Sequence, residues 1–228
     1  MLALAVKCMV QKVGLAQVTA QAISNRPPRL IIIAGATGVG KSTAAVGLAG
    51  RAGITRVVST DNIREVMRAG DPERQNPTLH RSSFSKGESG EATLDWSDTS
   101  LALESGILAT IQRAKREGID LIIEGVHMNP SARILNEWRE AGGVAVGVVM
   151  VVHEERVHRN MLRARDAHSY RRADRYLANF QRIRTIQDGL MERATIAHWP
   201  LIDPAREESD VERLFALLNK EIDEHGKV

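Results

Sequence analysis

A glycine-rich stretch near the start of the chain has residue types and a spacing suited to binding phosphate groups. Residues 35–42, GATGVGKS, fit the pattern G-x-x-x-x-G-K-[S/T] completely. Glycines let the backbone curl so that successive N–H groups point inward at phosphate oxygens, and the helix that follows adds its positive N-terminal end. In this pattern the lysine reaches the terminal phosphates and the hydroxyl ligates Mg²⁺. The stretch therefore predicts a site for a purine nucleoside triphosphate, with ATP and Mg²⁺ as the expected pair.

The same pattern predicts a role for each residue of the loop. The residues expected to bind the nucleotide are Gly35, Gly38, Val39, Gly40, Lys41, Ser42 and Thr43, and Lys41 is also a catalytic candidate. A second oxygen ligand is needed for the metal, and Glu124 ends the apolar run LIIEG, at the edge where parallel sheets gather their ligands. We expect Ser42 and Glu124 to hold Mg²⁺, with Glu124 also ordering the attacking group. A solvent-exposed glutamate at a strand end is the alternative.

A second constellation is suited to a phosphoryl acceptor. In TDNIR, residues 60–64, we expect Asp61 to accept or orient the proton of a substrate hydroxyl and Arg64 to bind an anionic group. Asp61 also suits the N-cap of the helix that follows, and the two roles are compatible.

Further donors for a carboxylate or phosphate occur in PTLHRSSFSKGE, residues 77–88. The acceptor-binding candidates there are His80, Ser82, Ser83 and Lys86. The composition equally suits an ordinary polar loop. His127 follows the strand of Glu124 and could face the same cleft, although a single histidine is more often structural.

Nine arginines between residues 156 and 184 predict a lid. In MLRARDAHSYRR they flank a short polar break, which suits planar cations that fold over a transferring phosphoryl group and exclude water. The leading candidates are Arg163 and Arg165 for catalysis and Arg171 for the nucleotide, in a lid of about residues 156–175. A solvated helix face accounts for several of the nine.

Strands and helices alternate along the chain. Apolar runs predict strands over residues 29–34, 56–60, 120–125, 144–152 and 199–203. Helical patterns cover residues 41–51, 61–70, 100–118, 130–140, 154–196 and 207–223, whereas residues 71–99 indicate a loop or partly ordered insertion. This alternation predicts an α/β protein, a three-layer αβα sandwich with a five-stranded parallel sheet and an Arg-rich helical lid.

The chain divides into residues 1–28, an N-terminal extension and linker, and residues 29–228, which carry the predicted fold. Residues 1–25 suit either an amphipathic helix or a poorly ordered terminus, and NRPPR, residues 25–29, then breaks the chain.

Composition restricts the function classes. The 228 residues are 43% hydrophobic and 26% charged, as in soluble globular proteins. The single cysteine suits a reducing compartment, and no apolar run approaches a membrane helix or a signal peptide, so a cytoplasmic protein without a membrane partner is expected.

The formal net charge is only +3, and the excess of lysine and arginine is concentrated in two regions, residues 1–60 and 156–184. This pattern suits a small anion better than a nucleic-acid surface, and only eight aromatic residues are present to stack on bases. A small anionic acceptor is therefore the expected partner and nucleic acid is not, while the oligomeric state stays open.

These segments resemble a known family. In order, IIIAGATGVGKSTAA, STDNIREVMR, PTLHRSSFS and IIEGVHMNP are similar to the 2-phosphoglycerate kinases, and RYLANFQRIRTIQDGLMERA resembles that family's long helix after the lid. The likeness covers about residues 30–203. It implies a P-loop kinase domain that uses ATP to phosphorylate 2-phosphoglycerate to 2,3-bisphosphoglycerate. The ATP phosphates would lie on residues 38–42 and the acceptor near Asp61, Arg64, His80 and Ser82, with Glu124 and His127 beside the transferring group.

The resemblance leaves other functions open. The family's archaeal members carry an additional N-terminal nucleotide-binding module, and only about 28 residues precede the first strand here, so the likeness covers the kinase domain alone. The alternatives are a kinase of another small phosphorylated acid, such as a mevalonate phosphate, a kinase of a nucleic-acid or nucleotide-sugar hydroxyl, and a nucleotide-gated regulatory protein without transfer activity.

Overall fold

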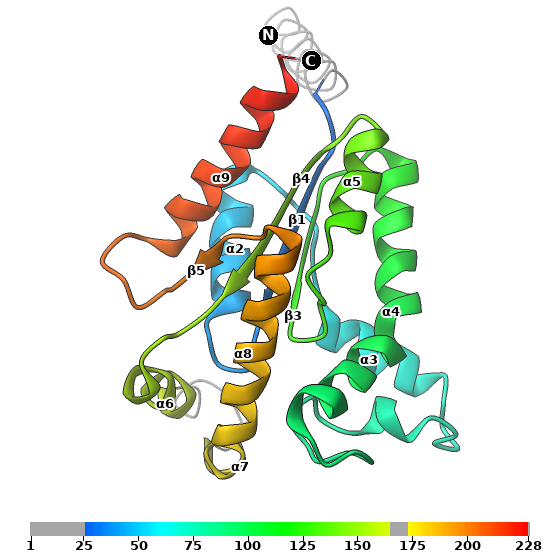
Figure 1. Cartoon of the computed structure of the whole chain (residues 1–228). Coiled ribbons are helices and arrows are strands. Elements are labelled where there is room, and N and C mark those ends of the chain that lie inside the picture. Colours follow the sequence, from blue (N-terminus) through cyan, green and yellow to red (C-terminus); the bar gives the residue numbers. More distant parts are fainter. Residues whose placement is uncertain (1–25, 165–172, 228) are drawn as a thin grey trace, which may run out of the picture.

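The computed structural model describes residues 26–164 and 173–227, in which a parallel five-stranded sheet of order β2-β3-β1-β4-β5 lies between helical layers (Figure 1). The strands are β1 (Arg29–Gly35), β2 (Val57–Ser59), β3 (Leu121–Gly125), β4 (Val144–Met150) and β5 (Leu201–Ile202). The helices are α2 (Lys41–Ala52), α3 (Thr60–Ala69), α4 (Ala92–Glu117), α5 (Ala132–Glu140), α6 (Glu155–Ala164), α7 (Ala173–Ala178), α8 (Phe180–Ala197) and α9 (Asp210–His225), with a 3₁₀ turn η1 (Pro77–His80). The predicted α/β fold and five-stranded parallel sheet are confirmed.

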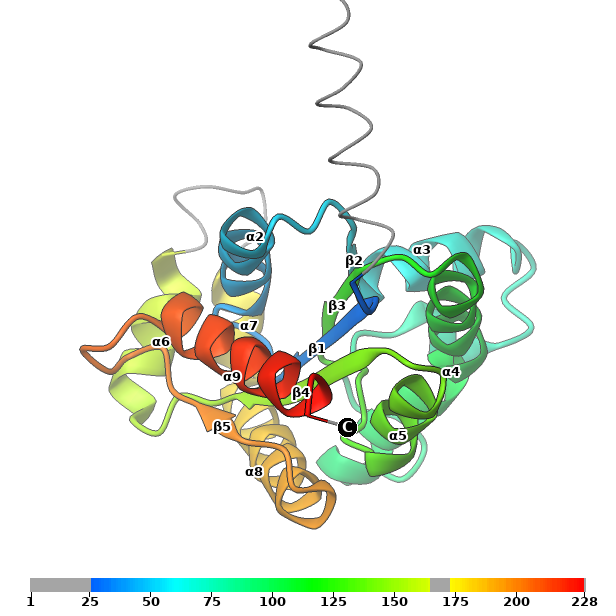
Figure 2. The same ribbon diagram turned by 90° about the horizontal axis from the view of Figure 1, so that it is seen from above.

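The sheet forms around three strands that are buried along their whole length and are apolar except for Arg29 and Glu124. Every residue of β1, β3 and β4 is buried, and β1 pairs with β3 on one side and β4 on the other. Such runs suit strands covered on both faces. Figure 2 shows α2 and α9 together on one side of the sheet and α4, α5 and α8 on the other. The core of the described residues therefore lies in two layers, one on each face.

The carboxyl edge of the sheet brings together segments that are distant in sequence. Glu124 on β3 is in register with Ile33 of β1 on one side and with Ser59 of β2 on the other. The chain leaves β1 and β2 at this same edge to start α2 and α3. Open α/β sheets bind their ligands at such an edge.

Helix α4 begins eight residues earlier than expected. The sequence predicted a loop through residue 99, but the Glu91 side chain accepts hydrogen bonds from the N–H groups of Thr93 and Leu94 and so caps a helix that starts at Ala92. The polar residues of this first turn are not exposed. Asp95, for example, is fully buried, which no periodicity argument anticipates.

Two helix starts also differ from the prediction. Ser59, rather than Asp61, caps α3, because its hydroxyl accepts a hydrogen bond from the Asn62 N–H at 3.1 Å. The helix predicted over residues 130–140 begins two residues later, at Ala132 of α5, and Ser131 precedes it. Since Asp61 is not the cap, its carboxylate is available for another role.

The Arg-rich region forms α6, α7 and α8, as its helical pattern predicted in outline. Residues 1–25 and 165–172 lie outside the described residues, and so do the predictions made for Arg165, for Arg171 and for the helix of residues 1–25. The division into residues 1–28 and 29–228, and the lid of residues 156–175, stay predictions. Among the helices that the structure describes, none is long and apolar enough to span a membrane.

A buried ion pair fastens the segment of residues 81–91 to the helical layer. Arg182 on α8 donates to the Asp95 carboxylate at 2.7 Å and to the carbonyls of Phe84 and Gly90 at 3.0 and 2.8 Å. The Asp95 carboxylate also accepts from the Gly87 N–H at 2.8 Å and the Ser89 hydroxyl at 2.7 Å. A surface loop with few apolar residues is held in one conformation by these bonds.

Replacing Arg182 with Met should destabilise the fold strongly. The variant removes the closer cation of the buried Asp95 carboxylate, at 2.7 Å, and leaves the more distant Arg81, at 4.0 Å. We expect the free energy of unfolding to fall by about 3 kcal/mol. Urea unfolding at pH 7 measures the change. The matched control is Arg113→Met, which breaks an exposed pair with Glu117 at 2.9 Å and should cost less than about 0.5 kcal/mol. Equal losses in the two variants would contradict this assignment.

The difference between wild type and Arg182→Met should also depend on pH. Burial alone would raise the pKa of Asp95, but bonds from Gly87, Ser89 and Arg182 hold that pKa well below its usual range. A carboxylate with a depressed folded-state pKa stabilises the fold above its unfolded value of about 4 and loses this contribution at lower pH. Arg182→Met removes one of these bonds, so the folded-state pKa of Asp95 is higher in the variant than in the wild type. The difference should therefore shrink as the pH falls through the Asp95 pKa of the variant, and be smallest in acid, where Asp95 is protonated in both proteins.

Candidate active site

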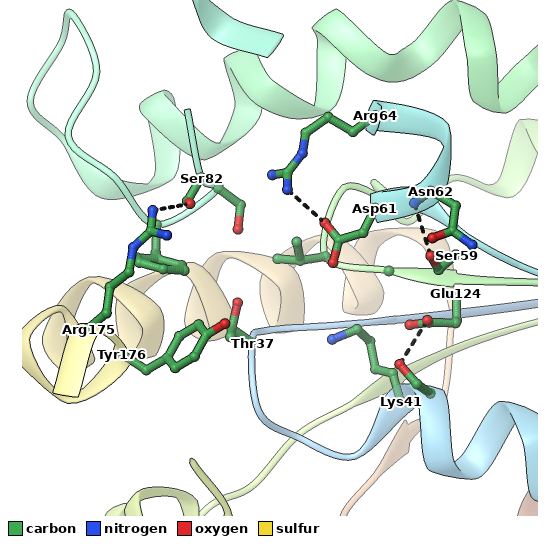
Figure 3. A pocket seen from close by; sticks show the side chains of 15 residues that line it. Thr37, Lys41, Ser59, Asp61, Asn62, Arg64, Ser82, Glu124, Arg175 and Tyr176 are labelled. Carbon is green, nitrogen blue, oxygen red and sulfur yellow. Dashed lines mark hydrogen bonds and ion pairs between the residues drawn. The ribbon is translucent and has the colours of Figure 1, made fainter. Parts of the chain in front are cut away.

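A polar cavity of about 310 Å³ opens at the carboxyl edge of the sheet. Its floor comes from the loop between β1 and α2 and from the ends of β2 and β3, and its far wall comes from α3, the segment of residues 82–84 and α7 (Figure 3). The lining residues with polar or charged side chains are Thr37, Lys41, Ser42, Ser59, Asp61, Asn62, Arg64, Ser82, Ser83, Glu124, Arg175 and Tyr176. Elements from all along the chain thus contribute to one site.

The backbone of the loop of residues 35–40 adopts conformations and a close approach to β4 that only glycine accommodates without strain. Gly38 and Gly40 have φ angles of 91° and 88°, in the left-handed region, and Gly40 is the residue from which α2 starts. At Gly35 a Cβ atom would lie 2.6 Å from the Met150 carbonyl oxygen, so the loop passes too close to β4 for a side chain. Lys41 donates to the Ala36 carbonyl at 2.8 Å across the loop. The loop and the start of α2 therefore fit a polyphosphate.

Val39 and Thr43 occupy different environments within the predicted nucleotide site. Val39 is fully buried, so only its backbone can face a ligand. Thr43 borders a second hollow of about 260 Å³, which also touches Gly38 and Gly40 and is closed by Met161 and Ala164 of α6. This second hollow therefore lies on the side of α6, whereas the larger cavity lies on the side of α3 and α7.

Ser42 and Glu124, the two predicted metal ligands, lie in contact. The Ser42 hydroxyl donates to the Glu124 carboxylate at 2.9 Å, and only 6% of Glu124 is exposed. Hydroxyl and carboxylate oxygens are the ligands that Mg²⁺ prefers, and Mg²⁺ usually keeps water and substrate oxygens as well. In the described part of the chain no group of three or more His, Cys, Asp or Glu side chains could hold a metal. The pair therefore fits an ion that phosphate oxygens help to bind.

Asp61 and Arg64 face the cavity from the first turns of α3. Arg64 makes only long contacts: its guanidinium lies 3.5 Å from the Asp61 carboxylate, from the Glu65 carboxylate and from the Arg81 carbonyl. Its side chain is 17% exposed, against 47% for Asp61. Contacts at this distance are too long for strong hydrogen bonds, so the guanidinium keeps capacity for an anion.

Arg175 on α7 forms the opposite side of the cavity. It donates to the Ser82 hydroxyl at 2.6 Å and lies over the Phe84 ring, 5.4 Å from its centroid. Tyr176 packs against the same ring at 5.4 Å. Ser83 is buried and lines the cavity next to them. Two arginines from different elements therefore face one small cavity, from α3 and from α7.

Two predicted acceptor residues do not line this cavity. His80 lies 3.1 Å from the Asp71 carboxylate, in a pair that closes the segment before η1. Lys86 is exposed beyond the buried Ser83 and Phe84. The segment of residues 77–88 thus contributes its serines to the cavity and not its basic side chains.

His127 lies behind the cavity wall. It is 2% exposed, and its Nδ1 is 3.0 Å from the hydroxyl of the fully buried Thr60, the first residue of α3. Burial, helped by the charges of Arg64 and Lys41, lowers the pKa of His127 to about 4 against the opposing charge of Asp61. The ring is therefore neutral at neutral pH, and it supports the start of the helix that carries Asp61 and Arg64.

The arginines of the expected lid divide into groups. Arg163 on α6 donates to its neighbour Asn160 at 3.1 Å, while Arg165 and Arg171 fall outside the described residues. Arg182 and Arg184 on α8 bind backbone carbonyls, Arg182 those of Phe84, Ser85 and Gly90, and Arg184 those of Val152 and His153. These last two are structural.

Several lining residues were not singled out from the sequence as site residues. Thr37, Ser59, Asn62, Phe84 and Tyr176 have no distinctive spacing. Arg175 was one of nine arginines, and only its place on α7, opposite Ser82, distinguishes it from the others. A usable signal for Phe84 and Tyr176 would have been that two aromatic residues lie beside predicted anion ligands in a chain with few aromatics.

Comparisons with known proteins agree with this geometry. Residues 30–189 match the family model described as AAA domain. The chain is 36% identical over 203 residues to a 2-phosphoglycerate kinase of Thermococcus kodakarensis, covering 86% of this chain and 68% of the relative. It is 35% identical over 204 residues to a 2-phosphoglycerate kinase of Methanopyrus kandleri, covering 86% of this chain and 62% of the relative. The chain thus spans about two thirds of the length of these relatives.

A solved structure of a protein from Chloroflexus aurantiacus j-10-fl matches the fold with a TM-score of 0.51 at 17% identity, covering 88% of this chain and 99% of the other. That likeness shows the fold alone. The matched model covers well over half of the chain, and the Thermococcus relative is matched over more than two thirds of its length. The chain therefore belongs to the AAA domain family and to the 2-phosphoglycerate kinase family.

Proposed function

We propose that the protein is a kinase that transfers the γ-phosphoryl group of ATP to a hydroxyl of a small anionic metabolite, namely 2-phosphoglycerate, to form 2,3-bisphosphoglycerate. The observation that carries the proposal is the shared cavity: a phosphate loop opens into a space of about 310 Å³ whose far wall presents Asp61, Arg64 and Arg175. The relatives named 2-phosphoglycerate kinase support the choice of acceptor.

In this proposal the loop of residues 35–40 and the start of α2 bind the ATP phosphates. Backbone N–H groups and the positive end of the helix attract the phosphate oxygens, and Lys41 reaches the terminal ones. Ser42 and Glu124 hold Mg²⁺, which when bound neutralises charge on the phosphates. Glu124 is buried and already accepts a hydrogen bond from Ser42, so the two oxygens are held together before any ligand arrives.

Asp61 is the proposed base for the acceptor hydroxyl. It lies on the wall opposite Lys41 in the same cavity, and it is not used as a helix cap. Its carboxylate orients the hydroxyl and accepts its proton as the new O–P bond forms.

The two arginines suit an acceptor that carries two anionic groups. 2-Phosphoglycerate has a carboxylate and a phosphate on one carbon atom, and Arg64 and Arg175 face the cavity from different helices. Planar guanidinium groups bind both anions through paired hydrogen bonds. Ser82 and Ser83 supply further donors, and Arg163, Arg165 and Arg171 remain proposed ligands of the transferring phosphoryl group.

The first test of the reaction is ATP consumption with Mg²⁺ and a panel of acceptors: 2-phosphoglycerate, 3-phosphoglycerate, glycerate and mevalonate phosphates. We expect turnover with 2-phosphoglycerate and formation of the bisphosphate. Asp61→Asn should lower kcat by about 10²- to 10⁴-fold, because it removes the base, while leaving ATP affinity unchanged. Glu65→Gln, the same change at an exposed position of α3, should keep kcat within about twofold.

Each outcome of this test has a separate meaning. Turnover of another acid with loss in Asp61→Asn would keep the mechanism and replace the substrate. ATP binding without turnover of any acceptor would contradict the kinase proposal and favour a regulatory protein.

A second test distinguishes the roles of Arg64 and Arg175 by comparing their variants with two different acceptors. With 2-phosphoglycerate, Arg64→Met and Arg175→Met should each raise the acceptor KM by about tenfold or more, since each loses charge-assisted hydrogen bonds, and leave the KM for ATP unchanged. With glycerate, which lacks the phosphate, the variant that lost the phosphate-binding arginine should behave as wild type does. Arg68→Met, on the same helix but paired with Glu65 at 2.8 Å, is the control. Unchanged acceptor KM in both variants would refute their assignment to the acceptor.

A further inference from the structure

His158 of α6 lies directly beneath the phosphate loop. Its ring is fully buried, and its Nε2 is 2.9 Å from the carbonyl oxygen of Thr37. A carbonyl oxygen can only accept, so Nε2 carries the proton. Burial lowers the pKa of His158, helped by the charges of Arg184, Lys41 and Arg159 and opposed by the Thr37 carbonyl. The ring is thus neutral at neutral pH, and its single N–H is used for this one bond.

This bond determines which way one peptide of the loop faces. In a trans peptide the carbonyl and the N–H of the next residue point in opposite directions, and no described peptide is cis. Because the Thr37 carbonyl is turned toward His158, the N–H of Gly38 points away from the His158 ring. An N–H in that position is one of the groups that bind phosphate oxygens in such a loop.

Close packing around His158 holds the phosphate loop and α6 in a fixed position relative to each other. Leu162, one turn further along α6, lies so close to Gly38 that a Cβ there would be 2.3 Å from the leucine Cδ2. On its other side the imidazole meets the edge of Phe180 on α8, with ring centroids 5.4 Å apart. The ring is therefore held between the Thr37 carbonyl and the Phe180 ring.

Helix α6 is itself anchored where it leaves the sheet. The Gln187 side chain of α8 accepts from the Val152 N–H at 3.0 Å and donates to the Val152 carbonyl at 3.2 Å. Arg184 donates to the His153 carbonyl at 3.0 Å. Helix α8 therefore helps to fix where α6, and with it His158, begins.

We propose that His158 is a positioning residue for ATP, which holds the Thr37–Gly38 peptide so that the Gly38 N–H faces the nucleotide phosphates. It acts through the peptide and does not touch the ligand. The inference rests on the proposed use of ATP by this loop. Nothing in the pattern G-x-x-x-x-G-K-[S/T] includes this histidine, which lies about 120 residues further along the chain.

Two substitutions of similar size distinguish positioning from simple packing. In His158→Gln the side-chain amide nitrogen can take the place of Nε2 and donate to Thr37, whereas in His158→Asn it falls near Nδ1 and is too short. We expect the Kd for ATP, measured by calorimetry, to stay within about threefold of wild type for Gln and to rise about tenfold for Asn, the loss of one hydrogen bond. The acceptor KM should be unchanged in both. The Tm values of the two variants, measured without nucleotide, should be similar.

The outcomes separate this inference from the proposed function. Equal Kd values for ATP in the Gln and Asn variants would overturn the positioning role while leaving the kinase proposal intact. Failure of the wild-type protein to bind ATP would instead refute the proposed function. Should the Asn variant fail to fold, ¹⁵N chemical shifts of His158 in the wild type decide the question. A neutral ring protonated at Nε2 is expected, and protonation at Nδ1 would overturn the inference.

Discussion

The structure depends on one constraint, the close passage of the chain out of its central strand. β1 is buried between β3 and β4, and at Gly35 the backbone passes so near the Met150 carbonyl that no side chain fits. The loop must therefore turn within a few residues and start α2 at Gly40. Its N–H groups gather at the carboxyl edge because the sheet leaves them no other space, and the rest of the site is arranged around that edge.

The distribution of arginines follows from the difference between buried and available charge. Arg182 and Arg184 use their donors on backbone carbonyls and, for Arg182, on the buried Asp95, so they hold segments in place. Arg64 and Arg175 make few or long contacts and face the cavity. A guanidinium has five donors, and whether the protein itself occupies them decides whether an arginine is structural or free to bind an anion.

The centre of the sheet could be predicted from the sequence because β1, β3 and β4 are buried along their whole length and are nearly continuous apolar runs. The phosphate loop could be predicted because its pattern is local. Prediction was wrong where tertiary contacts decide: the first turns of α4 looked like a loop, since no pattern reveals that Asp95 is paired with Arg182 across 87 residues. The contact of Arg175 with Ser82 was missed for the same reason, because it too joins residues that are distant in the sequence. Pairs brought together only by folding leave no spacing to recognise.

Helix α8 gives the two halves of the site a common support. Through Arg182 it holds the segment that carries Ser82 and Ser83, and through Gln187 and Arg184 it holds the start of α6, whose His158 contacts the phosphate loop. A transfer between two bound molecules needs their reacting atoms aligned to within about an ångström, and much of the rate depends on that alignment. One rigid helix that fixes both walls meets this need with fewer independent contacts than two separate supports would. The segment that carries Ser82 and Ser83 and the phosphate loop, which the proposal assigns to acceptor and nucleotide, are therefore aligned by the same core packing that stabilises the fold.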